Sequence, residues 1–207
     1  MNDAEAAQQL QTIRTLMERA ALYRRALGPV LTLAGTLGLG GAALGWSLPI
    51  LTREGFLRLW FSLAGVAIAG SFVLVRKQAL RAQEPFWTPP TRRVVSAMLP
   101  PAVAGIAASI ALIGLHLEGR ILALALPPAW LVCYGLALHA AGFFTLRGVR
   151  QLGWAFVLAG CGLGVAALLP AYDPSISHAH LLMGATFGLG HLIAGGRLLI
   201  EERKPAA

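Results

Sequence analysis

The chain alternates long apolar runs with short polar links. Each run carries at most one charged residue and is long enough to cross the roughly 30 Å hydrocarbon core of a bilayer as a helix. The pattern predicts six spans, at about 26–51, 56–75, 94–115, 121–144, 152–169 and 180–199. The expected fold is therefore all-α, a six-helix transmembrane bundle that forms one domain over residues 26–199.

Residues 1–25 form a polar leader ahead of the first run. Apolar side chains recur in it at helical spacing, at Leu10, Ile13, Met17 and Ala20. One apolar stripe on a polar helix is typical of a segment that lies in the membrane interface. The sequence therefore predicts an N-terminal amphipathic interfacial helix, and a short charged tail over residues 200–207.

Composition supports this class. Of the 207 residues, 57% are hydrophobic and 13% are charged, against roughly 25% charged in a soluble domain. The net charge of +8 would suit nucleic acid only if the basic residues shared one water-exposed face. They are scattered instead at the ends of the apolar runs, so we expect a lipid bilayer and no nucleic acid as partner.

The basic residues also predict an orientation. The segment 76–93, RKQALRAQEPFWTPPTRR, is the longest charged interruption, and Lys and Arg gather on the cytoplasmic side of a membrane. Placing this segment, the leader, the 145–150 link and the tail inside leaves only Arg53, Arg58 and Arg120 outside. Both termini are therefore predicted to be cytoplasmic, in a multi-pass protein of a prokaryotic inner membrane.

The spans contain few polar side chains, and among these the histidines stand out. All nine acidic residues lie outside the spans, which disfavours transport driven by intramembrane carboxylates. His139 and His191 each lie at offsets of three, four or seven from glycines of the same span, so both imidazoles should point into the bundle. With Tyr134 they are candidate contacts for a small ligand. More often such a histidine donates to a carbonyl or hydroxyl group of the next helix, and ligation of a haem or metal is the third alternative.

Glycines four residues apart predict close helix packing, more often within the bundle than at a dedicated oligomer face. The pairs are Gly41 and Gly45, Gly160 and Gly164, and Gly184 and Gly188.

A second polar group lies at the predicted outer rim. Its nitrogen and oxygen atoms suit zinc, nickel or copper, although histidines at a polar interface are more often solvated. The candidate ligands are His116, Glu118, Asp173, His178 and His180.

Aromatic residues lie near the predicted boundaries. In the 76–93 segment, Phe86 and Trp87 are flanked by prolines, and they predict either anchoring in the interface or docking of a protein partner at the cytoplasmic face. Trp46, Trp60 and Tyr172 near one boundary, and Trp154 near the other, are typical of aromatic belts.

Enzyme motifs are absent from the chain. HExxH, GxSxG and P-loop patterns do not occur. Six spans with a histidine near the start of the last one are loosely similar to rhomboid proteases, but the fourth span lacks the serine that such catalysis needs. We therefore expect no enzyme activity.

The segments LYRRALGPV, EPFWTPPTRRV and YGLALHAAGFF together resemble a family of bacterial integral membrane proteins with no assigned activity. The leading functional hypothesis is a binding or transport component for a small apolar solute, with no cofactor expected. A His-ligated haem or metal protein, and an interaction or sensory protein acting through 76–93, are the alternatives.

Overall fold

The structure is a computed structural model that describes residues 26–116, 118–169, 171–172 and 174–203. All regular structure in these residues is helical. They include six helices long and apolar enough to cross a membrane. The predicted all-α six-helix bundle is confirmed, and the protein is a multi-pass membrane protein. The predicted leader helix lies outside the described residues, as does the end of the tail.

The helices follow one another through short links. Their bounds are Ala26–Ser47 for the first span, Arg53–Arg81 for α2, Pro89–Gly114 for α3, Gly119–Ala141 for α4 and Arg147–Ala166 for α5. The last span consists of three consecutive pieces, α6 (Ile176–Met183), the π-helix η1 (Gly184–Leu189) and α7 (Gly190–Arg203).

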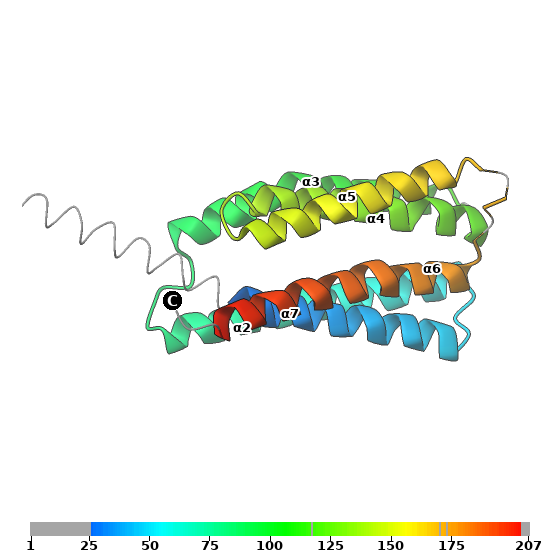
Figure 1. The fold of residues 1–207 in the computed structure, drawn as a ribbon. Coiled ribbons are helices and arrows are strands. Elements are labelled where there is room, and N and C mark those ends of the chain that lie inside the picture. Colours follow the sequence, from blue (N-terminus) through cyan, green and yellow to red (C-terminus); the bar gives the residue numbers. More distant parts are fainter. Residues whose placement is uncertain (1–25, 117, 170, 173, 204–207) are drawn as a thin grey trace, which may run out of the picture.

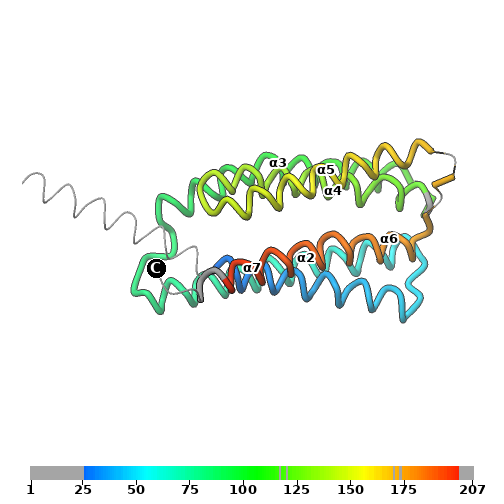
Figure 2. Tube along the Cα trace, viewed as in Figure 1, coloured from blue at the N-terminus to red at the C-terminus, as the bar shows by residue number. Residues whose placement is uncertain are grey.

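The six spans form two layers. Figures 1 and 2 show α3, α4 and α5 in one layer, and the first span, α2 and the last span in the other. In the layer of α3, α4 and α5, the middle helix α4 packs extensively against both neighbours, and more extensively against α5 than against α3. The last span contacts α4 through α6 and α5 through α7, so it is one of the elements that join the two layers.

Glycines let two pairs of helices approach closely. The first span meets the last one at Gly38 and Gly188, where a Cβ on Gly38 would lie 2.8 Å from the backbone nitrogen of Gly188. In the other layer, a Cβ on Gly153 of α5 would lie 2.5 Å from the backbone nitrogen of His139 in α4. Because glycine has no side chain, these backbones come into direct contact, as they do at small residues in membrane helices generally.

The predicted glycine pairs serve packing within this chain at most positions. A Cβ on Gly41, Gly45, Gly160 or Gly184 would meet atoms of another helix of the same chain, whereas Gly164 faces open space.

Two apolar clusters fill the interface between the layers. One includes Phe56 and Trp60 of α2, Leu126 of α4 and Met183 of α6. The other lies nearer the opposite end of α4 and is centred on a different set of side chains. These are Leu31, Leu131, Leu138, Val149, Leu152, Phe156 and Leu198. Outside the clusters, α2 and α3 expose many large apolar side chains, among them Ile68 at 71%, which fits contact with lipid.

Helix ends differ from the predicted spans by a few residues. α2 continues to Arg81 rather than ending near residue 75, so 76–81 is helical and the link is reduced to 82–88. Hydropathy marks the part of a helix that lies in lipid, whereas the backbone hydrogen-bond ladder continues into the polar region. The helix ends where Gln83 adopts a left-handed φ of 54°.

Candidate functional site

The last span presents two buried histidines, His180 and His191, to different neighbours. They are eleven positions apart, and a regular α-helix would place them about 20° from each other. The π-helix η1 lies between them. A π-bulge is equivalent to one inserted residue and turns all later side chains by about 100°. This turn allows His180 to face α2 while His191 faces α4.

His180 is fully buried, and both of its ring nitrogens are bonded. Trp60 donates its indole N–H to Nδ1 over 3.0 Å. Nε2 lies 3.1 Å from the carbonyl oxygen of Ile50, which can only accept. The ring is therefore the neutral Nε2–H tautomer, and Phe56 packs against it with the ring centroids 5.0 Å apart.

The aromatic cluster around His180 extends to α3 and α4. Phe56 stacks on Trp130 at 6.2 Å between centroids and 12° between planes. Trp130 donates its N–H to the Ser109 hydroxyl over 2.7 Å, and that hydroxyl donates to the Gly105 carbonyl over 2.8 Å. Because each polar group here has a partner, this cluster fastens α2, α3, α4 and α6 together.

His191 forms the second pair, with Tyr134 of α4. Its Nδ1 lies 2.6 Å from the carbonyl oxygen of Phe187, so Nδ1 carries the proton. Nε2 of the neutral ring then accepts from the Tyr134 hydroxyl over 2.9 Å. Phe156 and Phe187 enclose the imidazole, with ring centroids 5.2 and 6.1 Å from it. This bond joins the two layers in the apolar interior.

The Tyr134–His191 pair can still accept a hydrogen bond from another molecule. Both nitrogens of His191 are in use, whereas the Tyr134 oxygen retains acceptor capacity after donating its proton. Tyr134 is half-buried, and Phe156 and Phe187 lie beside it at 5.9 and 5.4 Å between centroids. The arrangement can therefore recognise a largely apolar molecule that carries a single hydrogen-bond donor.

The structure separates His139 from the other two predicted ligand contacts. Its ring packs edge-on against Trp154 of α5 and Phe143, with centroids 5.2 Å away in each case. Its Nδ1 is buried and has no hydrogen-bond partner among the described residues. In that part of the chain no bond or ring contact joins His139 to Tyr134 or His191, so the predicted group of three divides.

The predicted rim ligands have different surroundings. His116 is exposed and its Nδ1 lies 2.7 Å from the Gly114 carbonyl oxygen. His178 forms a capping box with Ser175 at the start of α6. His180 lies in the interior rather than at the rim. The described residues contain no group of three potential metal ligands, but Asp173 lies outside them, and the metal site stays a prediction.

The predicted anchors of the 76–93 segment have different environments. Phe86 packs edge-on against Phe72 of α2, with the centroids 4.9 Å apart. Trp87 is 54% exposed and is available to the interface. Whether this segment also docks a partner stays a prediction.

Trp60 and Trp130 are site residues that sequence reasoning missed. Trp60 was expected in the outer aromatic belt, yet it is 5% exposed and bonded to His180. The available signal was its spacing, since Phe56 and Trp60 are four apart and share one face of α2. An aromatic pair on one helix face indicates an inward-facing surface more strongly than a position near the boundary does.

Comparison with protein-family models, curated proteins and solved structures finds no match for this chain. The resemblance to a bacterial membrane protein family therefore stays a prediction.

Proposed function

We propose that the protein is a binding component, in transport or sensing, for a small and largely apolar solute with one hydroxyl or N–H donor. The solute lies beside Tyr134 and donates to its oxygen. The observation that carries the proposal is the Tyr134–His191 hydrogen bond, which joins α4 to the last span in an apolar interior. Polar side chains inside membrane segments are expensive to bury, and they frequently mark ligand pathways.

The packing supports a site between the layers rather than within one. The first and last spans are held together by backbone contact at Gly38 and Gly188, and α4 and α5 by contact at Gly153. Such pairs cannot part without losing close packing. The boundary between the layers consists instead of side chains such as Tyr134 and Phe187, which can change rotamer to admit a solute.

Hydrogen-bond capacity defines the solute. His191 fixes the Tyr134 proton, so a solute that offers only acceptors gains nothing from this site. A carboxylate or ammonium group would have no opposite charge to meet among Tyr134, His191, Phe156 and Phe187. We therefore expect neutral alcohols, phenols or simple amides with an apolar body.

A thermal-shift screen of the purified protein tests the proposal, using neutral apolar alcohols and phenols together with analogues that lack the donor. One hydrogen bond contributes about 1 kcal/mol, so Tyr134→Phe, combined with His191→Phe so that the freed Nε2 cannot replace the lost acceptor, should weaken binding of a donor-bearing compound about fivefold. The same variant should leave binding of the donor-free analogue unchanged. Tyr172→Phe, in the link before α6, is the matched control. Equal affinity of both analogues for the natural protein would refute the proposal.

A further inference from the structure

One end of the bundle is strongly basic, namely the end where α2 stops and α3 begins. Its basic side chains in the described helices are Arg76, Lys77, Arg81, Arg92, Arg93, Arg147, Arg150 and Arg197. An open depression of about 580 Å³ lies there between the first turns of α3 and the α4–α5 link. It is lined by Pro89, Arg92, Arg93, Ser96, Ala97 and Phe144.

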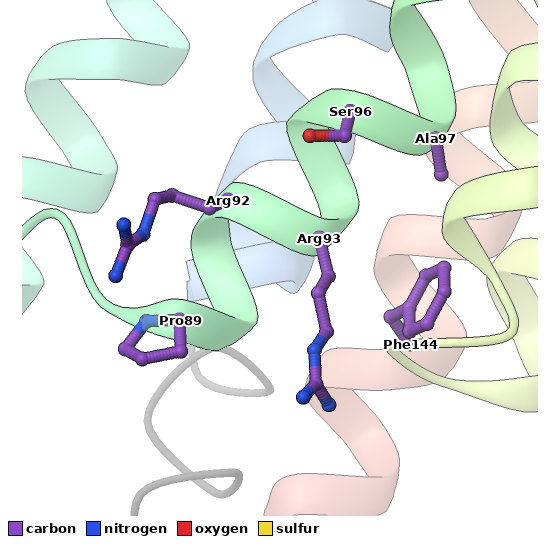
Figure 3. A pocket seen from close by; sticks show the side chains of 6 residues that line it. All are labelled: Pro89, Arg92, Arg93, Ser96, Ala97 and Phe144. Atoms are coloured by element: carbon purple, nitrogen blue, oxygen red, sulfur yellow. The ribbon is translucent and has the colours of Figure 1, made fainter.

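The two arginines give this depression its charge. Figure 3 shows the two side chains leaving the first turns of α3 in different directions, Arg92 away from Phe144 and Arg93 toward the start of the helix on the side of Phe144, which faces α3 from the link. Both arginines are exposed. Glu84 is the only acidic residue of the 76–93 segment, against five basic ones. A guanidinium keeps its charge at every relevant pH and matches a phosphate group with two parallel hydrogen bonds.

Backbone amides at the start of α3 contribute little to anion binding. Pro89 and Pro90 have no N–H, and the N–H of Thr91 is bonded to the Thr88 hydroxyl. Recognition of an anion in this depression therefore depends on side chains, which makes it testable by substitution.

An exposed apolar stripe continues from the depression along α3. Arg92 and Ser96 begin a series spaced by alternating steps of four and three, which places its members on one helix face. The four apolar members are each more than half exposed. They are Leu99, Val103, Ile106 and Ile110. A cationic pocket at the membrane boundary followed by an apolar stripe toward the membrane centre matches the shape and polarity of a phospholipid.

We propose that this depression binds the headgroup of an anionic phospholipid, with the phosphate held by Arg92 and Arg93 and an acyl chain lying along the apolar stripe. Basic pockets at the ends of transmembrane helices are suited to such lipids. Free phosphate could meet the same guanidinium groups, but it would make no use of the stripe. The lipid is therefore the ligand that both features fit.

The test measures thermal unfolding of the purified full chain in mild detergent. Three ligands are titrated separately: short-chain phosphatidylglycerol, phosphatidylcholine with the same chains, and inorganic phosphate. The test variant is Arg92→Gln/Arg93→Gln. The control variant is Arg76→Gln/Lys77→Gln, which removes the same charge from the same end of the bundle but outside the depression.

The natural protein should be stabilised by phosphatidylglycerol at far lower concentration than by either other ligand. At about 1 kcal/mol for each basic residue, the test variant should bind phosphatidylglycerol about thirtyfold more weakly, and the control should stay within about threefold. Native mass spectrometry of the natural protein should show one retained phosphatidylglycerol.

Three results would overturn the proposal. Stabilisation by phosphate equal to that by the lipid would indicate a free anion site. Equal weakening in both variants would indicate a diffuse basic surface. No shift and no retained phosphatidylglycerol would mean that the depression binds no such lipid.

Discussion

The contact between the first and last spans gives the sharpest stability prediction, through the variant Gly38→Ala. The added methyl carbon would lie 2.8 Å from the backbone nitrogen of Gly188 and 2.9 Å from its Cα. Non-bonded carbon atoms settle at about 3.5–4.0 Å, so the spans must separate by roughly 0.7 Å. Backbone atoms cannot rotate aside as a flexible side chain can.

The expected loss follows from two opposing effects. Overpacking of a well-packed contact costs about 1–3 kcal/mol, while Gly→Ala within a helix contributes up to about 1 kcal/mol in the other direction. We therefore expect Gly38→Ala to lower the free energy of unfolding by about 1–2 kcal/mol. Reversible unfolding in mixed micelles, followed by tryptophan fluorescence, measures it.

Gly40→Ala is the matched control for this prediction. It makes the same change two positions along the same span, where a Cβ would meet nothing within 4 Å. We expect no loss and a gain of up to about 1 kcal/mol. If both variants shift the free energy of unfolding equally, the first and last spans do not pack as described.

Two further substitutions test individual contacts by the same unfolding assay. Trp60→Phe should lower the free energy of unfolding by about 1–3 kcal/mol, because the buried Nδ1 of His180 loses its hydrogen-bond donor. Trp46 is exposed, so Trp46→Phe should lower it little, and equal losses in the two variants would contradict the Trp60–His180 bond. Gly153→Ala should destabilise through overlap with the α4 backbone, while Gly164→Ala, in the same helix α5 but facing open space, should not; a stable Gly153→Ala protein would count against the tight α4–α5 contact.

Hydropathy was sufficient to predict the six spans. A run such as 121–144 carries no charged residue and is long enough to cross the hydrocarbon core, and it must be helical there because lipid offers the backbone no hydrogen-bond partners. Glycine spacing also predicted close packing, as at Gly184 and Gly188. Helix ends such as Arg81 were harder to predict from the sequence, because they depend on local capping rather than on lipid contact.

The partners of the buried histidines could not be read from the chain. Trp60 and His180 are 120 positions apart, and their meeting depends on which helices are neighbours. The π-helix η1 turns His191 toward Tyr134, and neither hydropathy nor glycine spacing marks such a bulge. Position near a predicted boundary suggested that His180 and Trp60 face the interface, whereas packing between α2 and α6 buries both.

Alternating exposure of the links on the two sides of the membrane is the claim on which the whole account depends. Single cysteines at Ala82 and Glu118, in a chain whose Cys133 and Cys161 are replaced by alanine, place one label at each end of α3. A membrane-impermeant maleimide added to intact cells should label Glu118→Cys at once and Ala82→Cys only after permeabilisation, because the basic end is expected to face the cytoplasm. Labelling of both positions from the same side would contradict the six-span arrangement.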